Sequence, residues 1–197
     1  MEIRCPYCGA TSYHKSETLL LKGFETSFDL QLKDGSFFRK HCHICGKDNT
    51  VIHPLMYVDK QHHFVLLIKA KKEQKESDHE LHKGDTHLIK RYISDVEHIG
   101  EKISILEDEL DDRCIEILKV KLWLHYRKTG KLLNSIQYHD YDAKSKTLWF
   151  DIDIDGRKDI AGVEYTSYEA LKLKMLNMPS KFFEIDQSWA LTWMKTQ

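Results

Sequence analysis

The sequence predicts an α+β protein in which a zinc-ribbon-like antiparallel β module is followed by helices and an antiparallel β-meander. Two cysteine-pair motifs, Cys5–Gly9 and Cys42–Gly46, lie in a first part with a mostly β pattern. Apolar residues then recur at helical spacing between residues 94 and 126, and at every second position between residues 133 and 165. Strands, then helices, then strands again are typical of the α+β class.

The two cysteine-pair motifs have the chemistry of a zinc site. Cys5 and Cys8 lie three positions apart, as do Cys42 and Cys45, and a glycine directly follows the second cysteine of each pair. Two thiolates at this spacing chelate one ion when the chain turns tightly between them, and glycine supplies the positive φ that such a turn favours. Since four sulfurs complete a tetrahedral site, we predict one structural Zn²⁺ held by all four cysteines.

Three other roles for these cysteines compete with zinc. Structural disulfides are disfavoured, because the N-terminus has no export signal. Cys5-Pro6-Tyr7-Cys8 has the sequence of a glutaredoxin-type redox site, but that chemistry needs the first cysteine at the N-terminus of a helix, and residues 9–13 are a poor helix start. An iron site of the rubredoxin type uses the same four ligands and stays open beside zinc.

The fifth cysteine and two histidines are not expected to bind the ion. Cys114 lies inside an apolar helical pattern, which predicts a small buried core residue. His41 and His43 flank the second motif and could replace a ligand, but four sulfurs already close the site. We therefore expect both histidines beside the site or at the surface.

We predict that residues 1–70 form the ribbon-like module. Residues 71–88 have no apolar period, which predicts a polar linker or mobile excursion. Pro54 indicates an edge or interrupted strand. The predicted elements are strands at Thr11–Leu21 and Phe37–His41, a short helix at Phe24–Leu32, and a hairpin with arms Val51–Tyr57 and His63–Ile68. The three histidines of the linker, which we interpret as solvated, are His79, His82 and His87.

Residues 89–197 predict an α+β region of two helices, a three-strand meander and a C-terminal helix. Capping-box sequences begin at Ser94 and at Thr166, and Gly130 ends the second helix. The segment 151–156 matches half of a calcium loop but lacks its closing glutamate, so we interpret it as strand and turn. The predicted elements are helices at Ser94–Leu106, Asp111–Tyr126 and Thr166–Leu176, strands at Leu133–Tyr141, Thr147–Asp153, Asp159–Tyr165 and Phe182–Ile185, and a terminal helical turn at Trp189–Met194.

The composition excludes several classes of protein. The chain has 197 residues, of which 41% are hydrophobic and 31% are charged, with nine glycines and three prolines. These values exclude collagenous, disulfide-dense and wholly disordered proteins. The longest apolar run, Phe64–Ile68, is far shorter than a membrane span. We expect a cytoplasmic protein that does not bind membranes.

The charge gives weak support for nucleic-acid binding. The chain carries 30 basic and 31 acidic residues, so polyanion binding would need a local basic patch. The first seventy residues are slightly basic, and their candidate contacts are Arg4, Lys15, Lys22, Arg39, Lys40 and Lys47. The sequence holds no glycine-rich phosphate loop, nucleophile elbow or H-E-x-x-H helix, which favours a non-enzymatic role.

Three segments beside the cysteine pairs carry a resemblance to a known family. The chain resembles the bacterial and archaeal CpXC domain proteins through roughly residues 1 to 130. The resemblance rests on the two cysteine motifs and on the segments Pro54–Asp59, Glu101–Ile105 and Leu110–Glu116. The second motif has His43 where the first has Pro6, a difference that leaves both sulfurs in place. The resemblance implies a zinc-ribbon-like module and no particular activity. We therefore expect a zinc-stabilised module that binds a protein partner, with nucleic-acid binding as the alternative.

Overall fold

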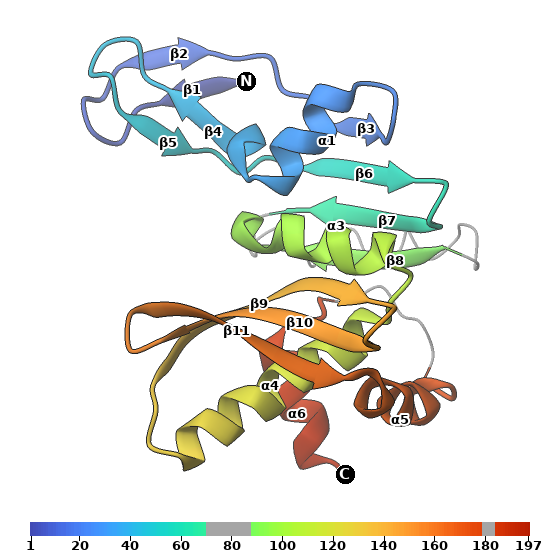
Figure 1. Cartoon of the computed structure of the whole chain (residues 1–197). Helices are drawn as coiled ribbons and strands as arrows, with labels where there is room; N and C mark the ends of the chain where they lie inside the picture. The colour runs from blue at the N-terminus through green and yellow to red at the C-terminus, as the bar shows by residue number, and fades with distance from the viewer. Residues whose placement is uncertain (70–87, 179–183) are drawn as a thin grey trace. The chain divides into compact units, whose positions relative to one another are not determined.

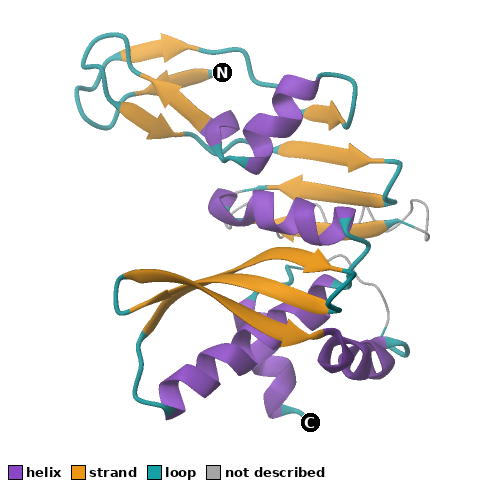
Figure 2. Cartoon of the chain, viewed as in Figure 1, coloured by secondary structure: helices purple, strands orange, loops and turns teal. Residues whose placement is uncertain are grey.

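The computed structural model describes residues 1–69, 88–178 and 184–197 (Figure 1). The chain divides into two compact units with the break between Gly100 and Glu101. Both units mix helices and strands, which confirms the predicted α+β class (Figure 2). Among the described residues, no helix combines the length and apolar character that crossing a membrane requires.

Some sequence predictions fall on residues outside the described ranges. These are the linker at 71–88, apart from Leu88, and the first two residues of the strand predicted at Phe182–Ile185. Glu184 and Ile185, the described end of that predicted strand, belong to no helix or strand. The linker histidines outside the described residues are His79, His82 and His87.

The first unit contains two short antiparallel hairpins, each of which carries one cysteine motif in its turn. This pair of hairpins is the antiparallel module that the motifs predict. The strands are β1 (Glu2–Arg4) and β2 (Thr11–Tyr13) in the first hairpin, and β4 (Arg39–His41) and β5 (Asp48–Thr50) in the second.

The first unit also contains a four-stranded sheet in the order β3-β6-β7-β8. Its central hairpin, β6–β7, is antiparallel as predicted, and all five residues of β7 are buried. The β3–β6 and β7–β8 pairs are parallel, and β8 was not predicted. The strands are β3 (Leu19–Leu21), β6 (Leu55–Asp59), β7 (Phe64–Ile68) and β8 (Ile89–Ile93).

The prediction of one strand over Thr11–Leu21 is wrong, because β2 and β3 belong to different sheets. The polar segment 14–18 separates them, and Nε2 of His14, its first residue, lies 2.9 Å from the hydroxyl of Ser12 in β2. β3 instead pairs with β6 and buries Leu20. The chain therefore forms two separate strands here, because β3 pairs with β6, a strand far along the chain.

One helix covers part of the four-stranded sheet. Helix α1 (Thr26–Lys33) confirms the predicted short helix, and the Tyr57 hydroxyl of β6 donates a hydrogen bond of 3.1 Å to its Asp29 carboxylate. The short 3₁₀ helix η1 (Ser36–Phe38) follows and buries two phenylalanines. The strand predicted from Phe37 therefore begins only at Arg39.

The second unit confirms the predicted helices and the three-strand meander. The 3₁₀ helix η3 (Val96–His98), in the first unit, leads into α3, and α4 packs against β9, α5 and α6 (Figure 1). The meander has the order β11-β10-β9. The elements are α3 (Ile99–Glu107), whose first two residues belong to the first unit, α4 (Asp112–Lys128), β9 (Leu133–Asp142), β10 (Thr147–Ile154), β11 (Arg157–Glu164), α5 (Tyr165–Met175) and α6 (Gln187–Lys195).

The observed helix caps differ from the two predicted capping boxes. A carboxylate oxygen of Asp111 accepts the N–H of Arg113 at 3.0 Å and caps α4. At the first capping-box sequence the cap is Asp95, one residue after Ser94. The box predicted at Thr166 is wrong, because α5 begins one residue earlier and no side chain caps it.

The core of the second unit is formed by α4 and the inner face of the meander. Cys114 is fully buried in it and belongs to the same core cluster as Phe150 and Tyr168. Burial raises the pKa of the Cys114 thiol to about 12, so it stays protonated at neutral pH. The prediction that this cysteine is a core residue is confirmed.

Candidate metal centre

The two cysteine motifs adopt the same backbone conformation. The N–H of Gly9 donates to the Cys5 carbonyl at 2.9 Å, and the N–H of Gly46 donates to the Cys42 carbonyl at 2.8 Å. Both glycines have positive φ, 73° and 69°, a region that side chains with a Cβ disfavour. Each glycine thus lets the chain turn back so that both thiols of its motif point to the same side.

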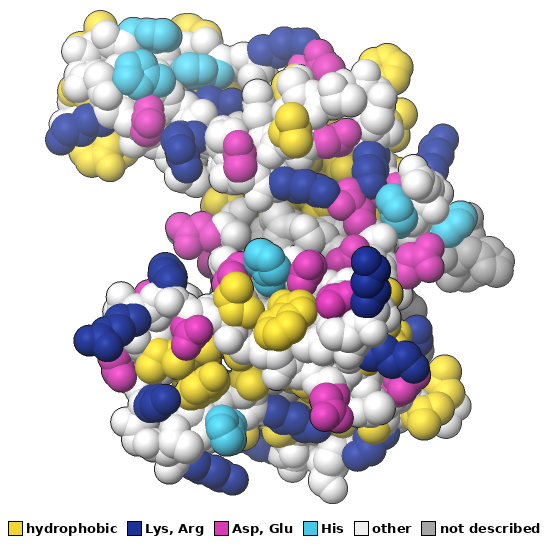
Figure 3. Space-filling model, viewed as in Figure 1, with side chains coloured by type: hydrophobic (Ala, Val, Ile, Leu, Met, Phe, Trp, Pro, Cys, Tyr) yellow, Lys and Arg dark blue, Asp and Glu magenta, His cyan; other side chains and the backbone are white. Residues whose placement is uncertain are grey.

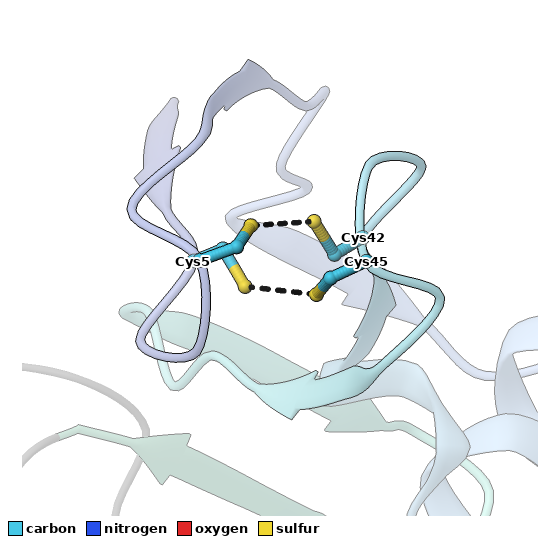
Figure 4. A group of neighbouring side chains, drawn as sticks. Cys5, Cys42 and Cys45 are labelled. Atoms are coloured by element: carbon cyan, nitrogen blue, oxygen red, sulfur yellow. Dashed lines mark hydrogen bonds between the residues drawn. The ribbon is translucent and has the colours of Figure 1, made fainter.

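The four sulfurs converge between the two hairpins, where Figure 4 shows Cys5 facing the labelled pair Cys42 and Cys45. The Sγ atoms of Cys5 and Cys45 lie 3.7 Å apart, as do those of Cys8 and Cys42, and all four lie within 4.8 Å of one another. A tetrahedral ion with metal–sulfur bonds of about 2.3 Å requires sulfurs about 3.8 Å apart. The arrangement therefore fits one tetrahedral ion, whereas a disulfide needs sulfurs about 2.05 Å apart.

The first motif lacks the local structure of a thiol-redox site. Residues 6–8 form a turn between β1 and β2 and not the first turn of a helix. The helix dipole that activates the first cysteine of a glutaredoxin-type site is therefore missing here.

The thiols interact strongly with one another and with nearby amides. Burial raises the pKa of Cys5, but the N–H groups of Cys8 and Tyr7 outweigh it and bring this pKa down to about 6. The N–H of Ala10 lowers the pKa of Cys8, but burial and the three other thiols raise it to about 12. The cluster thus favours some thiolates and resists having all four, unless a cation neutralises them.

One residue of the site was missed by the sequence analysis. Asn49, on β5, donates a hydrogen bond of 3.7 Å from Nδ2 to the Cys5 sulfur. The two flanking histidines keep their expected place beside the site. Nδ1 of His41 lies 2.9 Å from the Asp48 carboxylate, and its ring centre lies 6.1 Å from that of His43. Within the described ranges, the four cysteines are the one group with metal-binding spacing.

The basic residues proposed to contact nucleic acid have different surroundings. Lys15 lies 2.7 Å from the Glu17 carboxylate, and Lys22 lies 2.8 Å from the buried carboxylate of Asp59. Lys47 lies over the ring of Tyr7, with 4.6 Å from its Nζ to the ring centre. The others, which lie on or beside the hairpins, are Arg4, Arg39 and Lys40.

The comparison with protein families is decisive. The family described as "CpXC protein" matches residues 3–119, more than half of the chain. The chain belongs to the CpXC family. No curated protein matches it significantly, and no solved structure does.

The CpXC match covers both cysteine motifs and the three segments that carried the resemblance. The first of those segments is β6 together with the residue before it. The second is part of α3, and the third leads into and includes the start of α4. The match ends inside α4, so the meander lies beyond it. The matched residues of this chain thus include its four-cysteine cluster, whose spacing could hold a metal ion.

Proposed function

We propose that this CpXC protein is a non-enzymatic interaction module whose ribbon is stabilised by one structural zinc ion on Cys5, Cys8, Cys42 and Cys45. The single observation that carries the proposal is the convergence of four sulfurs at tetrahedral spacing. Four protein ligands leave no open position for a substrate or a reactive water, which is typical of a structural ion. Zinc is favoured over iron because it is the usual ion of paired C-x-x-C ribbons.

The tips of the two motifs support the interaction role. Tyr7 and Ile44 occupy the same position in the two motifs, between the cysteines, and are 59% and 77% exposed. Exposed aromatic and large aliphatic side chains on a rigid support are typical of protein interfaces. The metal would hold both side chains in fixed positions.

The metal part of the proposal predicts one zinc ion per chain. Elemental analysis of protein purified without added metal should find zinc near one equivalent and iron well below it. Because bound thiolates react slowly, four cysteines should resist iodoacetamide until a chelator is added, and Cys114 should resist it in both states. Protein without stoichiometric zinc, or with thiols of the two cysteine motifs that react at once, would disprove the zinc site.

The interaction part predicts that a partner binds at the motif tips. In a quantitative pull-down from native lysate, a Tyr7→Ser, Ile44→Ser double variant should lose most of the specifically retained protein. A Leu173→Ser variant, which alters an exposed leucine of α5, should retain as much as the wild type. Equal retention by all three proteins would argue against binding through the tips.

Nucleic-acid binding is the second candidate function, and the Lys47–Tyr7 pair favours it. An exposed ring beside an ammonium group can stack a base and bind its phosphate. Fluorescence anisotropy with labelled single-stranded DNA should then show binding that weakens steeply with salt, and Tyr7→Ala should weaken it about tenfold. Tyr13→Ala is the control, since Tyr13 is also exposed but bonds Glu2. An absence of binding at low salt would remove this candidate.

A further inference from the structure

The outer edge of the four-stranded sheet exposes apolar side chains. β3 is the edge strand of the order β3-β6-β7-β8. Its Leu19 and Leu21 are 53% and 41% exposed, and Phe24 in the next loop is 88% exposed. Figure 3 shows hydrophobic side chains, in yellow, on the surface where Figure 1 places β3 and α1. Apolar groups gathered on a surface often mark an interaction site.

The same edge offers backbone hydrogen-bonding groups. The Thr18 carbonyl and the Lys22 N–H each bond to β6 at 2.9 Å, and Leu20 pairs with β6 between them. Because a parallel ladder uses alternate residues, the N–H and C=O of Leu19 and the N–H of Leu21 point away from β6. In the part of the chain that the structure describes, no strand lies on that side. These groups are available to a strand that adds to the edge.

A groove of about 340 Å³ lies between this edge and α1. Leu20 and Phe28 contribute apolar surface to it, and its charged groups are Lys15 and the carboxylates of Glu17, Glu25 and Asp29. The Lys15 ammonium lies 2.7 Å from Glu17 and offsets one of these carboxylates.

The remaining charge of this groove is negative. Asp29 accepts hydrogen bonds from the Tyr57 hydroxyl and the Gly23 N–H, but neither group neutralises its charge. With three carboxylates against one ammonium, the groove favours a cationic occupant.

We propose that the β3 edge binds an extended basic segment of a partner protein as an added strand. Successive side chains of a strand point to opposite faces. Apolar side chains on one face of the segment pack on Leu19 and Leu21, while the alternate lysine or arginine side chains enter the groove toward Glu25 and Asp29. The stems of these long side chains lie along the apolar surface of Leu20, as such stems do elsewhere. The inference rests on the proposed interaction role but uses neither the metal ion nor the motif tips.

The test uses two fluorescein-labelled eight-residue peptides, one alternating lysine and valine and the other glutamate and valine. The full-length chain should bind the lysine peptide at micromolar Kd and the glutamate peptide at least about tenfold more weakly. Leu21→Lys should weaken binding of the lysine peptide about tenfold, by charge repulsion and lost apolar contact. Glu25→Gln should weaken it about threefold. Leu173→Lys, the same change at an exposed leucine of α5, should leave binding unchanged.

Three results would overturn the proposal: no saturable binding, equal binding of both peptides, or equal losses in Leu21→Lys and Leu173→Lys. A fourth overturning result would come from analytical sedimentation of the chain without peptide. If it shows a dimer that Leu21→Lys abolishes, the β3 edge binds a second copy of the chain and not a partner protein. The Tyr7→Ser, Ile44→Ser double variant should bind the lysine peptide as tightly as the wild type does. If the β3 edge does not bind the lysine peptide while the motif tips still retain a partner, this inference is wrong and the proposed function stands.

Discussion

Cys42→Ser is expected to unfold the two hairpins of the ribbon. Binding of a structural zinc ion supplies about 10–16 kcal/mol in zinc-finger peptides, as much as the whole stability of a typical domain. The hairpins have little else to hold them, since each strand has three residues and Ile3 is their one buried aliphatic side chain among the described residues. Hydrogen exchange read by mass spectrometry should show that amides of β1, β2, β4 and β5 lose their protection.

A matched substitution separates metal loss from general damage. Cys114→Ser makes the same chemical change at a buried cysteine of the second unit, so it should lower protection in α4 and leave the ribbon protected. A zinc chelator added to the wild type should reproduce the pattern of Cys42→Ser. Full protection of the hairpins in Cys42→Ser would show that no metal ion stabilises them.

The cysteine cluster could be predicted from the sequence because the sequence features that form it are local. The spacing of Cys5 and Cys8, with glycine next, sets the turn that aims both thiols, and the second motif repeats it. The sequence could not show that Asn49 donates to the Cys5 sulfur. That contact depends on how two hairpins from different parts of the chain meet, and Asn49 belongs to neither motif.

The fold was predictable where a local period is strong. The meander and α4 follow from alternation and from helical spacing over many residues. β8 was missed because its centre, Lys90 and Arg91, interrupts the apolar alternation of a short segment. Its strand conformation comes from parallel pairing with β7, and such pairing between distant segments leaves no local signature.

Buried charges in the second unit were also beyond sequence analysis. Lys102 and Asp112 pair at 3.0 Å, and Lys119 lies 2.8 Å from Glu101 and 3.3 Å from Glu116. All five side chains are nearly inaccessible to solvent, although charged residues on helices are usually exposed. Only the paired positions of α3 and α4 make burial of these charges tolerable, because each charge there meets an opposite one.

Lys119→Met is therefore expected to destabilise the second unit by about 3–5 kcal/mol, the usual cost of removing one partner from a buried ion pair. The substitution keeps most of the side-chain volume but leaves Glu101 and Glu116 without their shared cation. Urea unfolding followed by circular dichroism should show a lower midpoint. Although burial lowers the pKa of Lys119, Glu116 and Glu101 outweigh it and raise this pKa above 10.5. The stabilisation should thus be fully present below pH 10.5 and disappear as the pH rises through the folded-state pKa.

Two variants show whether lost charge pairing is the cause. Lys121→Met changes an exposed lysine two residues further along α4, so it should alter stability by less than about 0.5 kcal/mol. Burial raises the pKa of Glu116, which means that the fold disfavours its charge. Glu116→Gln removes that charge and leaves Lys119 paired with Glu101, so it should cost less than Lys119→Met. If Glu116→Gln costs as much or more, the Glu116 carboxylate is itself a required partner of the buried lysines Lys102 and Lys119, and the expected order of the two variants is wrong.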